Sequence, residues 1–521
     1  MKNKIFFPFF IAVSVVVGLF IGNNISANST AFFSNSSKSN KVEQLIELID
    51  KNYVDNVNTD SILDVAVNQI MESLDPHSVY ITHKEAESVA ESMRGDFVGI
   101  GVNFYIYKDT LTVVNTLPDS PCEKVGIKQG DRLLYAGKKP LYGKSISNDT
   151  VFKLLKGEIE SKVTLKWFRK TTNKIYTATI KRDVVPIKSV DINLMLNDSV
   201  GYIKLNRFSE TSFAEFKKAL TSLKKQGCSK LIFDLRDNGG GYMEIASQIL
   251  DEFLPDNALI VKTIDKNHQA SKLKATSKGE FQTQDLVVLI NENSASASEI
   301  VAGAIQDHDR GWIVGRRSFG KGLVQKEMPL ADGSVVRLTV SRYYTPSGRS
   351  IQKPYRDKGE DYFNEFLHRF EEDSLQTKVV DSLKFKTQKG RIVFGGGGIV
   401  PDIRFPYKTN IKNQSDLQII NSGLLDYFVF ETIDKNRLQY SELNEQQLLI
   451  KLEEKNYYKT DYRAYIAQSG YLIQYTKLDA EIEIAIKEAF TKSLFGDAAF
   501  YKLKLKNDAM VQKALLLKGR P

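Results

Sequence analysis

Residues 289–325 read LINENSASASEIVAGAIQDHDRGWIVGRRSFGKGLVQ. An apolar run ends at Ile290, a turn of small polar residues follows, and a helical pattern then leads to a second apolar run at 312–315. A strand that turns directly into a helix places hydroxyl groups beside backbone N–H groups that have no partner within the helix. Acyl-transfer chemistry requires this combination. The stretch therefore predicts a strand–helix–strand unit with a candidate site at its serine cluster.

The sequence on either side of this stretch repeats the alternation of strands and helices. Apolar strand-like runs at 200–205 and 230–235 flank a helical pattern at 213–224. This order predicts an α/β core, in which helices cover a central sheet. Two junctions rich in glycine and polar residues, 238–241 and 293–297, follow apolar strands directly. Open α/β sheets place their sites at such strand ends, so both junctions are candidate positions for a site.

Two segments of different periodicity precede the core. From 41 to about 92 the apolar residues recur with helical spacing, and Asp75-Pro76-His77-Ser78 ends the second helix because proline cannot continue it. Between 95 and 182 the pattern changes to short β-runs with one helical piece at 149–156. A final segment, from about 416 to 521, is helical again and has no role that the sequence assigns.

Length and composition limit the possible classes of protein. A chain of 521 residues is too long for one core, so we expect two to four domains. The net charge of +9 comes from basic residues scattered among acidic ones, without a nucleic-acid-binding motif. Cys122 and Cys228 lie far apart in the sequence and show neither metal-ligand spacing nor a disulfide framework. We therefore expect no nucleic acid, no metal and no cofactor.

The N-terminus carries a targeting signal. Lys2 and Lys4 precede an almost unbroken apolar run from Phe6 to Ile21, and a polar linker follows. The run is longer than a typical signal-peptide core and shorter than a full membrane span of roughly 20 residues. The sequence predicts export to a periplasmic or other extracytoplasmic compartment. It leaves open whether the segment is cleaved or anchors the protein in the inner membrane.

A nucleophilic serine needs a base, and the histidines are poor candidates. His308 lies twelve residues after Ser296, roughly 18 Å along a helix, and no nucleophile-elbow motif is present. Lys321 is a better candidate, since its glycine neighbours allow close packing and apolar residues surround it. An ordinary lysine is almost fully protonated at pH 7, so this amine has to be desolvated. Gln325, four residues later, is placed to orient the amine.

Two resemblances give these features a context. The strand order between 95 and 182, with the turn Gly99-Ile100-Gly101, resembles a PDZ domain and its carboxylate-binding loop. The motifs SASASEI (294–300), FGKGLVQ (319–325) and DLRDNGGG (234–241) resemble those of the C-terminal processing peptidases, also called tail-specific proteases. That resemblance covers roughly residues 41 to 406. It implies a ClpP/crotonase-like protease core with an inserted PDZ domain, N-terminal helices and a C-terminal helical domain.

The resemblance also assigns roles to particular residues. It implies that Ser296 is the nucleophile, Lys321 the base and Gln325 the residue that assists the lysine. The oxyanion hole is expected at the Ala297 N–H together with an N–H of Gly240 or Gly241. Gly239 stands where many relatives have proline. The peptide-binding loop is expected at Gly99, Ile100 and Gly101.

The sequence thus predicts an exported serine endopeptidase that recognises accessible C-terminal tails of proteins or peptides and cleaves them through an acyl-enzyme. Two alternatives remain: a catalytically silent PDZ scaffold, and another Ser-Lys hydrolase acting on cell-wall peptides, although the SxxK spacing of such enzymes is missing. A homo-oligomer or an adaptor protein remains open, as does a PDZ domain that gates the site. The expected division is a signal peptide or anchor (1–27), a linker (28–40), an N-terminal helical region (41–93), a PDZ domain (94–182), a protease core (183–406) with a polar insert (353–390), and a helical domain (407–521).

Overall fold

The computed structural model describes residues 41–144, 146–355, 362–363, 365, 383–406, 422–453, 457–470 and 479–521. The predicted signal or anchor segment 1–27, the linker 28–40 and most of the insert 353–390 lie outside these residues. Within them, no helix is long and apolar enough to cross a membrane. The chain divides into two compact units, Met1–Leu74 and Asp75–Pro521.

The first unit contributes two described helices, α2 (Lys41–Asn52) and α3 (Thr59–Glu72). The Asn58 side chain caps α3 by accepting a hydrogen bond from the Ser61 N–H at 3.1 Å. Although α2 is amphipathic, none of its residues is buried within the chain.

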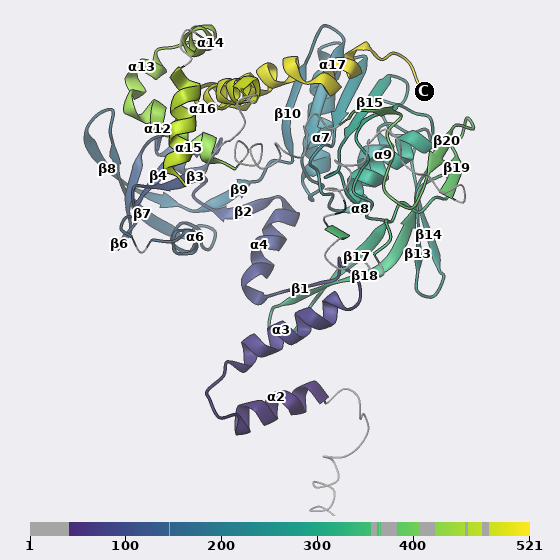
Figure 1. The fold of residues 1–521 in the computed structure, drawn as a ribbon, viewed down its shortest axis with the longest axis horizontal. Helices are drawn as coiled ribbons and strands as arrows, with labels where there is room; N and C mark the ends of the chain where they lie inside the picture. The colour runs from purple at the N-terminus through teal and green to yellow at the C-terminus, as the bar shows by residue number, and fades with distance from the viewer. Residues whose placement is uncertain are drawn as a thin grey trace, which may run out of the picture. The chain divides into compact units, whose positions relative to one another are not determined.

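The second unit is built around a six-stranded sheet (Figure 1). One edge strand, β10, is antiparallel to its neighbour, and the following strands are parallel. In spatial order the strands are β10 (Val190–Met195), β11 (Val200–Leu205), β12 (Lys230–Asp234), β15 (Asp285–Ile290), β16 (Trp312–Gly315) and β21 (Ile403–Arg404). All five residues of β12 are buried. A parallel strand that is covered on both faces is buried along its whole length in this way. The predicted α/β core is therefore observed.

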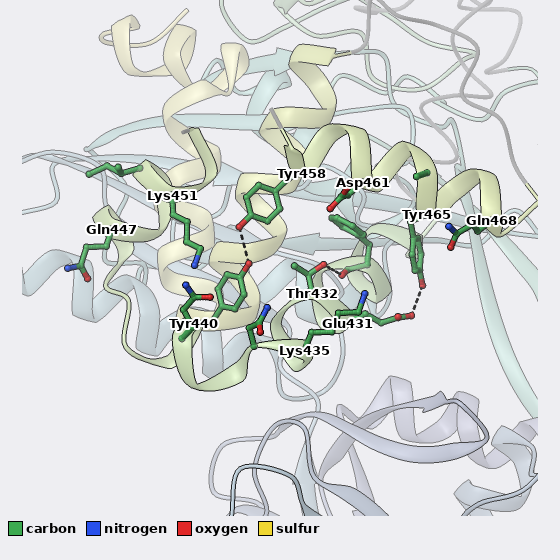
Figure 2. A pocket seen from close by; sticks show the side chains of 15 residues that line it. Glu431, Thr432, Lys435, Tyr440, Gln447, Lys451, Tyr458, Asp461, Tyr465 and Gln468 are labelled. Atoms are coloured by element: carbon green, nitrogen blue, oxygen red, sulfur yellow. Dashed lines mark hydrogen bonds between the residues drawn. The ribbon is translucent and has the colours of Figure 1, made fainter. Parts of the chain in front are cut away.

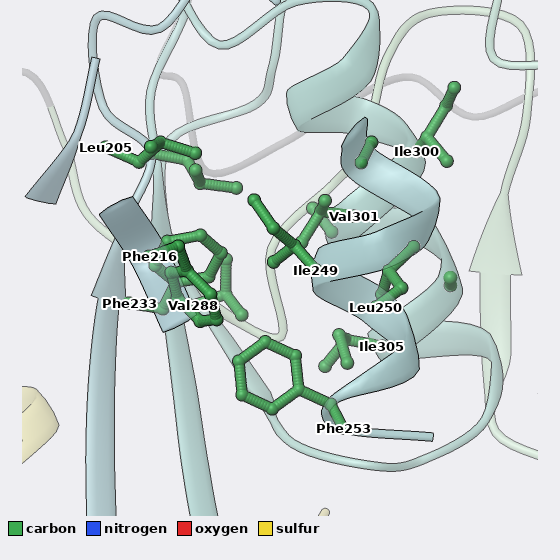
Figure 3. Close-up of a cluster of buried hydrophobic side chains, with 14 of the residues drawn as sticks. Leu205, Phe216, Phe233, Ile249, Leu250, Phe253, Val288, Ile300, Val301 and Ile305 are labelled. Carbon is green, nitrogen blue, oxygen red and sulfur yellow. The ribbon is translucent and has the colours of Figure 1, made fainter. Parts of the chain in front are cut away.

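Helices pack on one face of this sheet and form the main core with it (Figure 3). They are α7 (Ser212–Lys225), α8 (Met243–Asp251) and α9 (Ala297–Asp307). Leu231 and Phe233 of β12 belong to this cluster, whereas Ile232 points to a second cluster on the other face. That second cluster includes residues of α17 (Ala509–Leu516), the last described helix of the chain.

A second sheet adjoins the core, and its strand β17 (Leu323–Pro329) begins two residues after Lys321. Its other strands are β1 (Val79–Ile81), β18 (Val335–Tyr344), β13 (Leu259–Asp265) and β14 (Ala270–Lys274), and β17 pairs with β18. The short strand β1 lies within a region for which the sequence predicted only helices. It is followed by α4 (His83–Arg94).

A third sheet holds the short β-runs of residues 102–181. Its main strands are β3 (Val102–Tyr107), β4 (Thr110–Thr116), β5 (Arg132–Ala136), β7 (Lys162–Arg169) and β8 (Lys174–Lys181), and β6 (Lys139–Pro140) pairs with β5. Helices α5 (Pro121–Lys124) and α6 (Asn148–Leu155) accompany it. The strands β2 (Asp96–Gly99) and β9 (Asp183–Pro186) pair with each other on either side of it in the sequence.

The C-terminal segment is helical, as predicted, and has a core of its own. Its helices are α12 (Leu424–Lys435), α13 (Arg437–Ser441), α14 (Glu445–Glu453), α15 (Tyr457–Gln468), α16 (Asp479–Asn507) and α17. The backbone of α16 is interrupted at Gly496, where φ is 79°.

Candidate active site

Ser296 precedes helix α9 in a strained backbone conformation. Its φ is 54° and its ψ is −112°, a region that residues other than glycine rarely adopt. Two side chains help to hold the residue there: its N–H donates to Glu299 Oε2 at 2.9 Å, and the Tyr343 hydroxyl donates to its carbonyl at 3.2 Å. Strain of this kind is concentrated at functional positions, where the surrounding contacts maintain it.

The two neighbouring serines have structural contacts instead. The Ser294 hydroxyl donates to the Leu235 carbonyl at 2.8 Å and accepts from the Asn291 N–H at 2.9 Å. The Ser298 hydroxyl donates to the Asn238 carbonyl at 2.9 Å. Both side chains are fully buried, whereas Ser296 is partly exposed. Of the three serines, Ser296 is therefore the one that a substrate can reach.

The glycine junction after β12 packs directly against Ser296, so the two junctions meet. Asn238 organises the contact, because its carbonyl accepts a hydrogen bond from the Ala295 N–H at 3.1 Å. Gly240 has a φ of 103°, and a Cβ atom there would lie 2.9 Å from Ser296 Cβ. A side chain at residue 240 would thus displace the serine.

The backbone N–H groups around Ser296 differ in whether they already have a hydrogen-bond acceptor. The Gly240 N–H donates to Asn238 Oδ1 at 2.9 Å. Within the part of the chain that the structure describes, the N–H groups of Ala297 and Gly241 have no protein acceptor. Of the two glycines named as alternatives for the oxyanion hole, Gly241 is the one whose donor is not already engaged.

The Lys321 amine lies in a largely desolvated position. Burial lowers its pKa to about 8, and the nearby positive charge of Arg337 acts in the same direction, against the opposing effects of Glu299 and Asp75. Its Nζ donates a hydrogen bond to Gln325 Oε1 at 2.6 Å. At the pKa of about 8, roughly a tenth of the amines are neutral at pH 7, against about one in two thousand for an ordinary lysine.

Gln325 is held at both ends of its amide. Its Oε1 accepts from Lys321, and its Nε2 donates to the main-chain carbonyl of His77. Asp75 fixes that carbonyl, since its Oδ1 accepts from the N–H groups of His77 and Ser78, each at 2.9 Å. The amide is therefore oriented with its oxygen toward the amine.

The sequence did not reveal the contribution of His77. Its segment was interpreted only as a helix end, and 248 residues separate it from Gln325. Burial, together with the charge of Lys321, lowers the pKa of the His77 ring to about 4, so the ring is neutral at pH 7. The ring lies 2.7 Å from the Tyr362 hydroxyl. His308, which the sequence argument excluded, lies with its Nε2 2.7 Å from the Leu259 carbonyl.

A buried carboxylate, Glu299, connects the serine loop with the lysine loop. Its Oε2 accepts from the backbone N–H of Ser296 at 2.9 Å and from that of Lys321 at 2.8 Å. Its Oε1 accepts from the Ser318 hydroxyl at 2.6 Å and from the Gly320 N–H at 2.7 Å. Burial raises its pKa despite these four donors.

The shared oxygen of Glu299 brings the backbones of Ser296 and Lys321 together. No hydrogen bond joins Ser296 Oγ to Lys321 Nζ among the described residues; the amine donates to Gln325 Oε1 instead. Ser296, Lys321 and Gln325 thus form one cluster in which the hydroxyl and the amine are not yet in contact. Catalytic hydrogen bonds are often formed only when substrate is bound.

The turn Gly99-Ile100-Gly101 lines a cavity of about 300 Å³ together with β3 and the end of α6. Phe104 and Phe152 contribute apolar walls, with ring centroids 5.6 Å apart. Lys156 also lines the cavity and forms an ion pair with Glu91 of α4. The three residues predicted to bind a peptide carboxylate therefore line a real groove with a cation in its wall.

A larger cavity, of about 760 Å³, lies within the C-terminal helical domain (Figure 2). Its walls come from α12 to α15 and carry tyrosine, amide and charged side chains, including Glu431, Lys451 and Asp461. The Tyr440 and Tyr458 hydroxyls, 3.0 Å apart, join two of its walls. None of the clustered residues Ser296, Lys321 and Gln325 lines it, so size alone does not identify the chemical site.

Two family models match parts of this chain. The model of Peptidase family S41 matches residues 199–359, and that of the Activating protease CtpB N-terminal domain matches residues 21–85. The carboxy-terminal-processing protease of Bartonella bacilliformis is 32% identical over 347 residues, which cover 65% of this chain and 79% of the relative. The carboxy-terminal processing protease CtpB of Bacillus subtilis is 32% identical over 332 residues, covering 63% of this chain and 68% of the relative.

Among solved structures, the photosystem II D1 C-terminal processing protease matches with a TM-score of 0.36 and 24% identity, covering 71% of this chain and 94% of that one. Both relatives are more than 30% identical to this chain over more than two thirds of their own length, and this similarity shows the family. The chain belongs to the carboxy-terminal-processing protease family and is a serine-type protease.

Proposed function

We propose that the protein cleaves polypeptides near accessible C-terminal tails, with Ser296 as nucleophile and Lys321 as base. The observation that carries this proposal is the desolvated Lys321 amine, oriented by Gln325 and tied through Glu299 to the backbone of Ser296. Its lowered pKa supplies a neutral amine near neutral pH.

In the first step the Ser296 hydroxyl attacks the scissile carbonyl carbon, and its proton passes to Lys321 Nζ. The C–N bond then breaks, and the leaving amine takes that proton from the lysine. This gives an acyl-enzyme on Ser296. A water molecule then attacks the ester carbon and gives a proton to Lys321 Nζ. The lysine passes this proton to Ser296 Oγ as the ester bond breaks, and the product leaves with its new C-terminal carboxyl group.

The oxyanion formed in each step needs donors that are not otherwise occupied. The Ala297 N–H, at the first turn of α9, and the Gly241 N–H meet this condition. Loss of one such donor typically reduces the rate by a factor of about 10² to 10³.

Labelling with a fluorophosphonate, combined with peptide cleavage, tests the assignment. Ser296→Ala is expected to lose both labelling and cleavage. Ser294→Ala and Ser298→Ala are matched controls that remove only structural hydroxyls and should still be labelled. Labelling that persists in Ser296→Ala would exclude this nucleophile.

The base is tested with Lys321→Ala against Lys326→Ala, which removes a nearby exposed lysine of β17. Lys321→Ala should remain folded and lose cleavage, while Lys326→Ala should cleave normally. Undiminished cleavage by Lys321→Ala would refute the dyad. If the unmodified protein is neither labelled nor active on any peptide, a catalytically silent scaffold is the better interpretation; activity on cell-wall peptides alone would favour another Ser-Lys hydrolase.

The proposal includes a PDZ domain inserted before a ClpP/crotonase-like core. The third sheet, α6 and the groove at Gly99-Ile100-Gly101 support it, because consecutive N–H groups of such a turn bind a carboxylate while the peptide lies along a strand edge. A peptide with a free terminal carboxylate should bind in fluorescence anisotropy at least about tenfold more tightly than its amidated form. Equal affinities would contradict a carboxylate site.

Export is part of the same proposal and rests on the N-terminal sequence. Residues 1–40 fused to alkaline phosphatase should give enzyme activity, because this reporter folds only after export. A fusion that lacks residues 1–27 is the matched control and should be inactive. Cell fractionation then separates a cleaved signal from an anchor at the inner membrane. An inactive full fusion would contradict export.

A further inference from the structure

The last described helix, α17, covers the second face of the core sheet. Figure 1 shows it at the end of α16, beside the strands of this sheet. Val511 and Ala514 of α17 are fully buried in a cluster with Ile232 of β12 and Leu289 of β15. This helix therefore contributes to the core on which the site is built, although it lies outside the residues 199–359 that the S41 model matches.

Strand β12 binds α17 at both of its ends. Lys230, the first residue of β12, donates through Nζ to the carbonyls of Ala514 at 2.7 Å and Leu515 at 3.0 Å. Arg236, two residues beyond the strand, donates through Nη1 to Asp508 Oδ2 at 2.7 Å. Asp508 is also the N-cap of α17 and accepts from the Met510 N–H at 2.9 Å. The helix and the strand are thus joined at both ends.

Arg236 begins the junction that leads to the glycines beside Ser296. Its guanidinium is shared, since Nε also donates to the buried Asp234 at 3.0 Å. Burial alone would raise the pKa of Asp234, but the Arg236 charge and that of Lys204 hold it below its usual range. The Lys204 amine donates to the Arg236 carbonyl at 2.8 Å. Side chain and backbone of Arg236 are therefore both fixed.

The position of Arg236 determines where the rest of the junction lies. Asp237 follows with a φ of 62°, and its Oδ1 accepts from the Asn291 and Asn293 side chains at 2.7 and 2.9 Å. Asn238 then holds the Gly240 N–H through its side chain. Arg236 lies only five residues before Gly241 in this junction. Its position therefore contributes to where the Gly241 N–H lies relative to Ser296.

We propose that Asp508 of the helical domain is a positioning residue for the oxyanion hole, acting through Arg236 on the glycine junction. This inference rests on the proposed function, because it assumes that the Gly241 N–H stabilises the oxyanion. It gives the helical domain a part in the chemistry of a site to which it contributes no catalytic residue.

Asp508→Asn isolates the ion pair. Asparagine is as good an N-cap as aspartate, so α17 keeps its cap, while the charge that holds Arg236 is removed. Lys230→Met is the matched control, since it removes the contact at the other end of α17 and leaves Asp508 and Arg236 unchanged. Both substitutions remove a contact of α17, but only the first removes a contact of Arg236, the residue that leads into the glycine junction.

The test uses the full chain, a fluorogenic peptide and a peptide aldehyde of the same sequence, whose hemiacetal with Ser296 carries the oxyanion. Asp508→Asn should lower kcat about 5- to 50-fold and lower the affinity for the aldehyde by a similar factor. KM should change little, because a small misplacement of the Gly241 N–H affects the transition state rather than substrate binding. Asp508→Glu should restore much of both values. Lys230→Met should lower Tm and leave both kcat and the affinity for the aldehyde unchanged.

The outcomes separate the two hypotheses. If Asp508→Asn and Lys230→Met lower Tm alike and leave kcat and aldehyde affinity unchanged, Asp508 is only structural and the inference is wrong. If the unmodified protein binds the aldehyde no better than the corresponding peptide acid, the proposed oxyanion chemistry itself is wrong.

Discussion

Lys321 gives the proposed mechanism a pH signature. Its pKa of about 8 means that the neutral, basic form increases as the pH rises through 8. We therefore expect kcat/KM to rise about tenfold per pH unit below 8 and to level off above it. The measurement is kcat/KM between pH 6 and 10 with a peptide that has no titrating group in this range. A profile that is flat from pH 6 to 8 would contradict a lysine base.

The same burial should make Lys321 costly for stability. A pKa lowered from 10.5 to about 8 corresponds to roughly 3 kcal/mol against the charged form in the folded state. This penalty is complete below pH 8 and disappears as the pH rises through 8 to 10.5. Lys321→Met should thus be inactive yet more stable by about 1 to 3 kcal/mol in urea at pH 7, with a smaller difference at pH 10. Lys326→Met, at an exposed position, should leave stability unchanged.

At the level of single residues, the sequence could identify the types of chemical group at the site, but it could not decide which of several identical residues is the functional one. Three serines share the motif, and only the family resemblance selected Ser296. The reason lies in contacts across the sequence: the Ser294 and Ser298 hydroxyls bond to residues 59 and 60 positions away. His77 was missed for the same reason. Its backbone carbonyl orients Gln325, and a carbonyl carries no sequence signal at all.

At the level of elements, helix α9 matters through Glu299 in its first turn. The carboxylate accepts four hydrogen bonds, and two of them come from the backbone of Ser296 and Lys321. Glu299→Gln would place an amide N–H₂ against two donors. Each hydrogen bond to a charged group contributes about 1.5 to 3 kcal/mol, so a loss of at least about 3 kcal/mol is expected in urea denaturation, with a strong fall in kcat.

Glu292→Gln is the control for this prediction. The substitution breaks the ion pair that Glu292 forms with Arg316 at 2.6 Å, close to the same loop. Glu292 itself binds neither the backbone of Ser296 nor that of Lys321. Its activity should be close to that of the unmodified protein. Equal effects of the two substitutions would show that Glu299 has no special part in joining the two loops.

Elements with strong local periodicity were predictable from the sequence. The expected helical piece 149–156 is α6 (Asn148–Leu155), and β7 and β8 are two of the short β-runs expected between residues 95 and 182. Strand β1 was not foreseen, because its three residues form a strand only by pairing with β18, with Val79 opposite Arg337. Such a short strand is defined by its distant partner and has no pattern of its own.

At the level of the whole molecule, Asp434 joins the helical domain to the third sheet. Its buried carboxylate accepts two hydrogen bonds from Arg132, at 2.9 and 2.6 Å, and Lys170 donates to its carbonyl at 2.7 Å. Nearby, the rings of Tyr105 and Tyr427 stack with centroids 4.1 Å apart. The helical domain therefore contacts this sheet at one end and the core sheet, through α17, at the other.

Asp434→Ala should release this contact. Removing one member of a buried ion pair leaves the other charge unpaired and typically costs about 3 to 5 kcal/mol. Limited proteolysis within residues 424–468 should then be much faster, and the midpoint of urea unfolding should move to lower concentration. Glu453→Gln, which removes an exposed pair with Lys487 in the same domain, should change stability by less than about 0.5 kcal/mol. Equal proteolysis of both variants would argue against Asp434 as the joint.

The place of α17 on the sheet has a consequence for biosynthesis. Every strand that this helix covers leaves the ribosome before residues 509–516 are translated. Until then, Ile232 and Leu289 face water and Arg236 lacks its partner in the helix. An emerging chain therefore has its serine and its lysine but not the last support of its glycine junction. If Asp508 positions the oxyanion hole as proposed, the site reaches full activity only after residues 509–516 have folded onto the sheet.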